Sequence, residues 1–264
     1  MGNETGQIER AKKFSALHIK GDPLIIFNVW DAGTANAAAE MGAKAIATGS
    51  YAVALANGFE DGEMTPLELV LANLKRIVST VDLPVSLDFE GGYAREQDEL
   101  AENIKKVIAT GAIGINFEDR IVAGEGIYCV EEQVARIRAI RQAADESSIP
   151  LFINARTDIF LSRDTATHTE EHLQGSIERA HAYSEAGASG FFAPALVNPE
   201  FIGRLCAESP LPVNILVWPG APTSKALADL GVARISYGGG SYRTTMGSFK
   251  EAARTAFEWR AADA

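Results

Sequence analysis

One stretch of the sequence combines a short apolar run, two alternating carboxylates and a pair of glycines: Pro84-Val85-Ser86-Leu87-Asp88-Phe89-Glu90-Gly91-Gly92. The apolar run is short enough to be a buried strand. Because alternate residues of a strand project to the same side, we expect Asp88 and Glu90 to point the same way from the strand end. The stretch therefore predicts a buried strand that presents a pair of metal-binding carboxylates.

The same unit, an apolar strand followed by a polar or glycine-containing loop and a helix, recurs on both sides of this stretch. Each unit spans about 30 residues, the size of a βα repeat. Near-continuous apolar strands are typical of a parallel sheet that is covered on both faces. Eight repeats fit a closed (β/α)8 TIM barrel better than a doubly wound sheet. The predicted strands are residues 24–30, 45–48, 85–87, 114–117, 151–154, 190–192, 213–217 and 234–237.

The two ends of the chain read as helices outside these repeats. A helix over residues 7–20 carries Phe14 and Leu17, which could plug one end of the barrel. A second helix at about 242–262 has an apolar side and could close its own barrel or pack on a neighbouring subunit. No linker, low-complexity run or shift in composition marks a boundary, so we expect one domain over residues 1–264.

Composition limits the possible partners. The chain is 47% hydrophobic and has a formal net charge of -11. Such a charge repels nucleic-acid phosphates and anionic lipid, so we expect neither as a partner, although one basic pocket could hold a small anion. Two cysteines, Cys129 and Cys206, form no disulfide framework and fit a reducing compartment. With polar first residues and no apolar run of membrane-spanning length, the sequence predicts a cytoplasmic protein.

Polar residues gather at the predicted carboxyl ends of the strands, where a TIM barrel holds its catalytic groups. This end is acidic, with Arg156 as its most prominent base, which suits a divalent cation and an anionic substrate. The residues at these ends are Asn28 and Asp31, Gly49-Ser50-Tyr51, Asp88 and Glu90, Asn116 and Glu118-Asp119, Asn154, Arg156 and Asp158, Pro194, Asn214 and Trp218, and Tyr237-Gly238.

Three of these residues, Asp88, Glu90 and Glu118, offer oxygen ligands from neighbouring strands without a matching set of cysteines or histidines. Hard oxygen ligands favour Mg²⁺, or Mn²⁺, over zinc. The alternative is that these acids cap helices or pair with Arg156. Gly49 and Ser50 could donate to a carboxylate or a developing enolate oxygen, or could simply form a tight turn that needs glycine.

Several motifs together resemble the isocitrate lyase and phosphoenolpyruvate mutase superfamily, and the resemblance covers nearly the whole chain. It implies a Mg²⁺-dependent barrel that breaks or forms a C–C or P–C bond next to a 2-oxo acid, through a metal-bound enolate. It also implies a homo-oligomer, a dimer or tetramer, that exchanges its terminal helix between barrels. The motifs are Asn28-Val29-Trp30-Asp31-Ala32, Gly49-Ser50, Glu60-Asp61-Gly62-Glu63, Leu87 to Tyr93, Asn116-Phe117-Glu118-Asp119 and Asn154-Ala155-Arg156-Thr157-Asp158.

The resemblance also implies roles for single residues. Asp88 would bind the metal directly and would contact the substrate, while Glu90 and Glu118 would hold the ion largely through its waters. Asp61, Glu118 and Arg156 would be catalytic, with Asp61 contacting a metal-bound water or the reacting group and Arg156 lying on the far side of the substrate. Gly49 and Ser50 would grip the substrate carboxylate and oxyanion. Tyr51 and Asn214, at other strand ends, complete the candidate substrate-binding residues.

Two features depart from the superfamily pattern. Glu90 stands where the pattern usually has aspartate, and the loop of residues 120–129 is short and contains no lysine, with Cys129 outside the cysteine motif of the family lyases. The position of the mutase histidine falls near Phe192-Ala193-Pro194. The proton donor stays open between Cys129, Tyr128 and water.

These observations predict a lyase or decarboxylase that acts on a small 2-oxo or 2-hydroxy di-acid of the oxaloacetate type. Two alternatives remain at this point. One is a phosphonopyruvate-type P–C bond hydrolase or mutase. The other is a non-catalytic protein that binds 2-oxo acids and has lost its proton donor.

Overall fold

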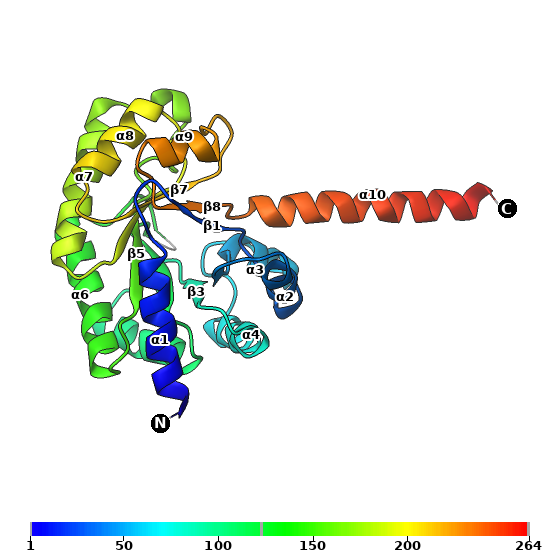
Figure 1. Cartoon of the computed structure of the whole chain (residues 1–264), viewed down its shortest axis with the longest axis horizontal. Coiled ribbons are helices and arrows are strands. Elements are labelled where there is room, and N and C mark those ends of the chain that lie inside the picture. The colour runs from blue at the N-terminus through cyan, green and yellow to red at the C-terminus, as the bar shows by residue number, and fades with distance from the viewer. Residues whose placement is uncertain (1, 122–123, 263–264) are drawn as a thin grey trace.

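Eight parallel strands form a nearly closed barrel in the computed structural model, which describes residues 2–121 and 124–262 (Figure 1). Neighbouring strands follow the order β1-β8-β7-β6-β5-β4-β3-β2. The (β/α)8 barrel predicted from the repeats is therefore confirmed. The strands are β1 (Leu24–Ile26), β2 (Ile46–Ala47), β3 (Val85–Asp88), β4 (Gly114–Glu118), β5 (Phe152–Arg156), β6 (Gly190–Ala193), β7 (Val213–Leu216) and β8 (Arg234–Ser236).

Helices follow the strands and cover most of the outer face of the barrel, as the repeats predict. One short helix, α3, directly follows β2 and is not among the helices expected from the sequence. A 3₁₀ turn also forms at Thr165–Thr167. The helices after the strands are α2 (Ala32–Glu40), α3 (Ser50–Ala56), α4 (Leu67–Thr80), α5 (Gln97–Ala109), α6 (Val130–Glu146), α7 (Glu170–Glu185), α8 (Pro199–Glu208) and α9 (Ser224–Asp229).

The barrel closes between β1 and β2 through two backbone hydrogen bonds of Val29, to the Ala47 carbonyl at 3.0 Å and from the Gly49 N–H at 3.1 Å, and through the side chain of Asn28. The backbone link there is an isolated parallel bridge between Val29 and Thr48. Beside it, the amide nitrogen of Asn28 donates to the carbonyl of Thr48 at 2.9 Å. The amide oxygen of Asn28 accepts from the N–H groups of Tyr237 and Gly238, at 3.1 and 2.7 Å. Asn28 thus joins β8, β1 and β2, and this buried residue positions the seam of the barrel.

Helix α1 (Gly2–Ala16) crosses the end of the barrel opposite the strand carboxyl ends and fills it with Phe14. Phe14 is fully buried, and its ring lies edge-on to Phe152 with centroids 5.2 Å apart. A Cβ on Gly114 would lie 3.2 Å from the Phe14 ring and 3.1 Å from the Phe152 carbonyl, so glycine leaves room for the plug. The expected plug is present, and Leu17 packs against the same cluster.

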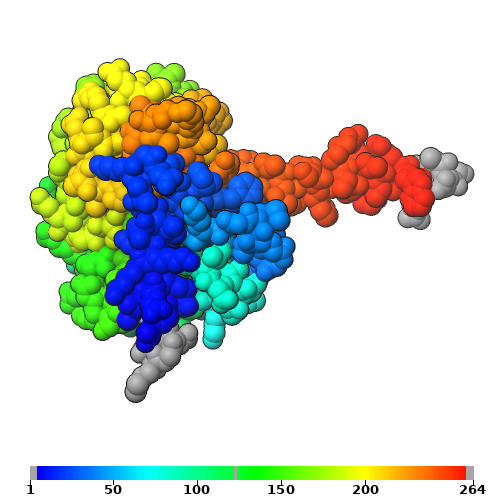
Figure 2. Space-filling view, viewed as in Figure 1, coloured from blue at the N-terminus to red at the C-terminus, as the bar shows by residue number. Residues whose placement is uncertain are grey.

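The last helix, α10 (Gly240–Ala262), runs away from the barrel instead of lying against it (Figures 1 and 2). Its first residues are anchored, because the Ser241 hydroxyl donates to the Asn28 carbonyl at 2.6 Å and Tyr242 contacts Trp30. Further along, the side chains of Phe249 and Phe257 are exposed. Within residues 2–121 and 124–262, no helix is both long and apolar enough to span a membrane.

Candidate functional site

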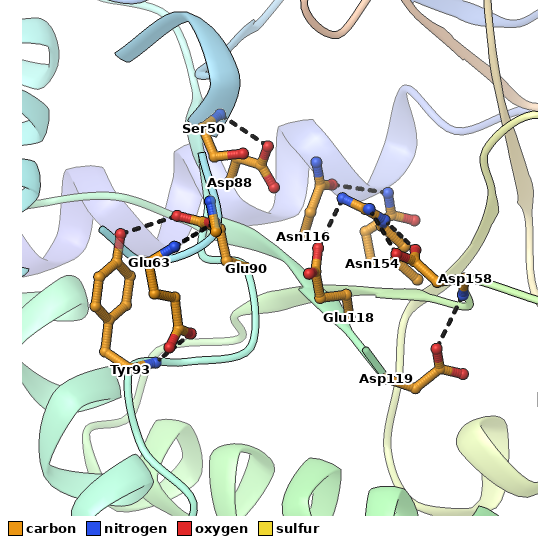
Figure 3. A network of polar contacts seen from close by, with 12 residues as sticks. Ser50, Glu63, Asp88, Glu90, Tyr93, Asn116, Glu118, Asp119, Asn154 and Asp158 are labelled. Carbon is orange, nitrogen blue, oxygen red and sulfur yellow. Dashed lines mark hydrogen bonds and ion pairs between the residues drawn. The ribbon is translucent and has the colours of Figure 1, made fainter. Parts of the chain in front are cut away.

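A cluster of carboxylates lies at the carboxyl ends of β3 and β4, beside the start of α3 and the end of β5 (Figure 3). Strand register explains the gathering, because Glu118 pairs with Arg156 and Asp88 pairs with Asn116 in the parallel ladder. Side chains at the same end of adjacent parallel strands meet at the barrel mouth. Ser50 joins them because α3 begins directly after β2.

Asp88 keeps one carboxylate oxygen free. Its Oδ2 accepts the backbone N–H of Ser50 at 2.9 Å, and its own N–H donates to the Thr48 hydroxyl at 2.9 Å. Its Oδ1 is buried and has no hydrogen-bond partner among the described residues. A buried carboxylate oxygen without a donor costs free energy unless a cation or water meets it. Asp88 is therefore oriented and still able to accept one ligand.

Glu90 reaches the cluster by a different route from the one expected. Strand β3 ends at Asp88, and Glu90 has a left-handed backbone with φ of 50°. The expected strand alternation is thus wrong for this pair. The Oε2 of Glu90 accepts the N–H groups of Gly62 and Glu63 at 3.0 and 2.8 Å, and its Oε1 accepts from the Tyr93 hydroxyl at 3.0 Å. Burial, and then the charges of Asp88 and Asp61, raise the pKa of Glu90 to about 7.

Glu118 pairs with a rigidly held arginine. The Glu118 Oε2 lies 2.7 Å from Nη1 of Arg156. Asp158 grips the same guanidinium at two points, with Oδ1 at 2.6 Å from Nε and Oδ2 at 2.9 Å from Nη2. Burial raises the pKa of Glu118 well above its usual value, against the opposing charge of Arg156. The alternative that these acids pair with Arg156 thus holds for Glu118.

Asp61 belongs to the same cluster although it lies on a solvent-accessible loop before α4. Partial desolvation of its carboxyl group and the negative charge of Asp88 raise its pKa, while a hydrogen bond with the Ser50 side chain opposes the shift. These interactions place Asp61 beside both Ser50 and Asp88.

The other candidate residues lie around this cluster without contacting it through the hydrogen bonds of the described residues. Asn214 is buried inside the barrel, where its amide oxygen accepts from Ser236 at 3.0 Å and its amide nitrogen has no partner among the described residues. Tyr51 turns toward the start of α10, with the Arg243 guanidinium 5.4 Å from its ring centroid. Gly49 has an extended backbone with φ of -128°, and a Cβ there would meet nothing closer than 3.5 Å. Its conformation therefore does not require glycine.

The carboxylates at the barrel mouth offer few direct ligands to a divalent cation. Across the described parts of the chain, no group of three or more His, Cys, Asp and Glu side chains is arranged to hold a metal ion directly. The free Oδ1 of Asp88 offers one direct contact, and both oxygens of Glu90 are already hydrogen-bonded. One direct carboxylate with further carboxylates at water distance is the donor set of a hydrated hard cation such as Mg²⁺. The residues present fit that ion.

Three side chains that hold the site residues in place have no role predicted from the sequence. Tyr93 donates to Glu90, Glu63 accepts the Tyr93 N–H at 2.7 Å, and Asp158 orients Arg156. Asp158 could have been recognised from its two-residue spacing to Arg156, whereas Tyr93 has φ of 58°, which sequence pattern does not reveal.

Neither protein group proposed as proton donor faces the cluster. The Cys129 thiol is exposed at the start of α6 and donates to Glu132 at 3.3 Å. The Tyr128 ring stacks on Arg136, whose guanidinium carbon is 4.5 Å from the ring centroid. Residues 122 and 123 of the short loop lie outside the described residues.

Comparison with known proteins places this geometry in context. The sequence profile described as phosphoenolpyruvate phosphomutase matches residues 14–257. An uncharacterized protein of Mycobacterium tuberculosis (strain ATCC 25618 / H37Rv) is 34% identical over 241 residues, which are 91% of this chain and 87% of that protein. The 2-methylisocitrate lyase of Escherichia coli (strain K12) is 31% identical over 239 residues, covering 86% of this chain and 77% of the lyase. A crystal structure from Burkholderia cenocepacia J2315, provisionally assigned as a phosphonomutase, has 45% identity and a TM-score of 0.92, covering 95% of this chain and 99% of that one.

Proposed function

Because the chain belongs to the phosphoenolpyruvate phosphomutase family, within the superfamily that includes isocitrate lyase, we propose that it is a Mg²⁺-dependent lyase or decarboxylase. Its substrate class is a small 2-oxo or 2-hydroxy di-acid of the oxaloacetate type, and the bond it breaks is a C–C bond. The observation that carries the proposal is the free, buried Oδ1 of Asp88 in a cluster that also contains Arg156. The 31% identity to a 2-methylisocitrate lyase supports C–C cleavage.

Asp88 and its neighbours supply the electrostatics of this reaction. Asp88 would hold the ion through Oδ1 while Ser50 fixes its other oxygen, and Glu90 and Glu118 would act through water. When bound, Mg²⁺ stabilises the negative charge that develops on the 2-oxo oxygen as the bond breaks. Gly49 and Ser50 lie at the start of α3, and their backbone N–H groups donate to the Val29 carbonyl at 3.1 Å and to Asp88 at 2.9 Å. The Ser50 hydroxyl is the group of this pair that would meet the substrate carboxylate.

Arg156 is suited to grip the substrate. A guanidinium has five N–H donors. In this protein three of them point at Glu118 and Asp158, which leaves two for a carboxylate of the substrate. Because Asp158 holds the planar group from one side, the remaining donors have a fixed direction. Asp61 is suited to proton transfer, since its raised pKa brings it closer to neutral pH and it lies beside Ser50.

Substitution of Asp88 tests the metal site. Asp88→Ala removes the free Oδ1, so we expect Mg²⁺ affinity and turnover of oxaloacetate each to fall by more than about 100-fold. Isothermal titration with Mg²⁺ and an assay of released carbon dioxide measure the two effects. Asp229→Ala is the matched control, because Asp229 is the last residue of α9 and forms an exposed ion pair with Lys225. Retained activity in Asp88→Ala would rule out the mechanism.

P–C bond cleavage is the second candidate, favoured by the 45% identity to a structure provisionally assigned as a phosphonomutase. Parallel assays of the wild-type protein with oxaloacetate and with phosphonopyruvate separate the two reactions. Carbon dioxide from the first substrate supports the lyase, and phosphate from the second supports P–C hydrolysis. Tight binding of oxalate without turnover of any 2-oxo acid would instead favour a binding protein.

We also propose that the protein is a homo-oligomer in which α10 packs on a neighbouring barrel. The exposed apolar residues Phe249, Phe257 and Trp259 lie along this projecting helix. A cavity of about 660 Å³ opens beside β1, where the exposed side chains of Ile25 and Phe27 lack a covering helix. A helix with exposed aromatic side chains and an uncovered apolar face on the same chain are complementary, and exchange between copies would bury both.

A further inference from the structure

Helix α7, on the outer side of the barrel, carries two buried polar side chains that point toward the barrel mouth. Arg179 and Tyr183 are four residues apart and therefore lie on the same helix face. Both contact Asp119, the residue that follows β4. Arg179 is 8% exposed, and Tyr183 and Asp119 are fully buried. None of the three has a role in the proposed reaction.

Both oxygens of the Asp119 carboxylate accept hydrogen bonds. Its Oδ2 accepts from the Tyr183 hydroxyl at 2.9 Å and from Nη1 of Arg179 at 3.1 Å. Its Oδ1 accepts the backbone N–H of Asp158 at 2.9 Å. Burial raises the pKa of Asp119, and the charge of Arg179 opposes that shift. Removing one partner of a buried ion pair leaves an uncompensated charge, so the position of Asp119 depends on both side chains of α7.

One branch of this network leads to the substrate. Asp119 fixes the Asp158 backbone, and the Asp158 carboxylate grips Arg156 at two points. A shift of Asp158 therefore turns the guanidinium whose free donors face the substrate. Figure 3 shows the Asp119 carboxylate joined to the Asp158 backbone, with Glu118 nearby at the ends of β4 and β5.

A second branch leads to the loop after β4. The Tyr128 N–H donates to the Asp119 carbonyl at 2.8 Å, and the Tyr128 carbonyl accepts from Nη2 of Arg179 at 2.9 Å. Tyr128 is thus held on both sides, one residue before the Cys129 that caps α6. The same arginine contacts the Asp119 side chain and the end of this loop.

We propose that Arg179 and Tyr183 are positioning residues, which set the direction of Arg156 through Asp119 and Asp158 and lock the end of the β4–α6 loop to the same anchor. The inference rests on the proposed function in one respect, that Arg156 grips an anionic substrate. The side chains of α7 do not touch the substrate. They determine how well the mouth recognises a carboxylate, and the contacts that orient Asp88, the proposed direct metal ligand, come from Ser50 and Thr48 and not from this network.

Two substitutions test this role. Tyr183→Phe removes one hydrogen bond to the buried carboxylate, and we expect KM for oxaloacetate and the Kd for oxalate to rise about tenfold, with kcat changed less than about threefold. Arg179→Met removes the contacts to the Asp119 carboxylate and to the Tyr128 carbonyl, and it should raise both constants further. Mg²⁺ affinity should stay at the wild-type value in both variants, which separates a positioning effect from general disruption of the mouth.

Arg141→Met is the matched control. Arg141, in α6, is also a half-buried arginine that donates to backbone carbonyls, at 2.7 Å to Leu151 and 3.1 Å to Gly187, but these acceptors precede β5 and β6 and so lie at the opposite end of the barrel from the mouth. Its substitution should lower Tm and leave KM and oxalate affinity unchanged. If Tyr183→Phe lowers Tm and likewise leaves both constants unchanged, the role is structural and the inference is wrong.

Backbone hydrogen exchange keeps this test separate from the proposed function. In Tyr183→Phe and Arg179→Met, the amides of Asp158 and Tyr128 should exchange faster than in the wild-type protein, and in Arg141→Met they should not. Absence of oxalate binding and turnover in the wild-type protein would overturn the proposed function, while faster exchange at both amides would still support the coupling. Unchanged exchange at both amides would overturn the coupling itself.

Discussion

His18 is a histidine kept neutral by the fold. One ring nitrogen donates to the Phe14 carbonyl at 2.8 Å, and the ring stacks on Phe152 with centroids 4.1 Å apart. Desolvation, and then the positive charge of Arg234, lower its pKa from 6.5 to about 3. The fully buried Arg234 extends inside the barrel, with its Nε 3.2 Å from the Ser236 hydroxyl. Protonation of His18 would therefore place a second positive charge near Arg234.

The lowered pKa predicts a specific loss of stability in acid. Between pH 6.5 and about 3 the unfolded chain binds a proton at His18 and the folded chain does not, so the free energy of unfolding falls as pH falls. Above pH 6.5 His18 is neutral in both the folded and the unfolded chain, so this loss of stability is absent. His18→Phe keeps the stacked ring and removes the titration, so its stability should depend less on pH across that window. Urea unfolding at a series of pH values measures this, and parallel curves for both proteins would contradict it.

At the scale of elements, α1 acts as the floor of the barrel. The helix itself is amphipathic only weakly, so its attachment depends on a few inward side chains, with Phe14 at the centre. The Gln7 side chain adds two hydrogen bonds, donating at 2.9 Å to the carbonyls of Ile108 and Ala112. Helix α1 is thus attached to the region around β4 through both apolar and polar contacts.

Phe14→Ala should lower the free energy of unfolding by about 3–5 kcal/mol, because a buried aromatic ring is lost and a cavity remains beside Phe152 and His18. Urea unfolding measures the change, and the m-value should stay constant if only stability changes. Lys12→Ala, on the exposed side of the same helix, is the control. A loss below about 1 kcal/mol would show that Phe14 is not the plug.

At the scale of the whole molecule, the projecting α10 leaves two apolar surfaces in water, one on the helix and one beside β1. Phe257→Asp places a charge on the helix surface, where this side chain is 75% exposed in the single chain. We expect the variant to sediment as a smaller species than the wild-type protein in analytical ultracentrifugation. Leu69→Asp, at an exposed position of α4, should leave the mass of the sedimenting species unchanged. A wild-type protein that is monomeric at micromolar concentration would exclude the exchange of α10.

The barrel is predictable from the sequence because each strand is a short apolar run, whereas the apolar residues of the following helix recur at helical spacing. The same repeats place Asp88, Glu118 and Arg156 at strand ends, and parallel register then brings them together. Family membership, expected from the motifs, is confirmed by the match over residues 14–257. The chemical roles of the site residues stay predictions.

Other parts of the site depend on features that a local pattern does not contain. Glu90 is positioned by a left-handed backbone after its strand, and α3 begins with no side-chain cap that would mark its start. Asp119 meets Arg179 across 60 residues of sequence, so neither residue predicts its partner. Such contacts arise only when the barrel has closed.

The seam held by Asn28 has a consequence for how the chain folds. Its hydrogen bond to Gly238 joins residues 210 positions apart, so the two ends of the chain must meet before the barrel closes. Contacts of such long range carry a large loop-closure entropy and slow the folding of the proteins that depend on them. The parallel ladder of β1 and β8 joins residues equally far apart, and the Asn28 amide adds a side-chain link to it. The first and last strands can therefore pair only when nearly the whole polypeptide is available to fold.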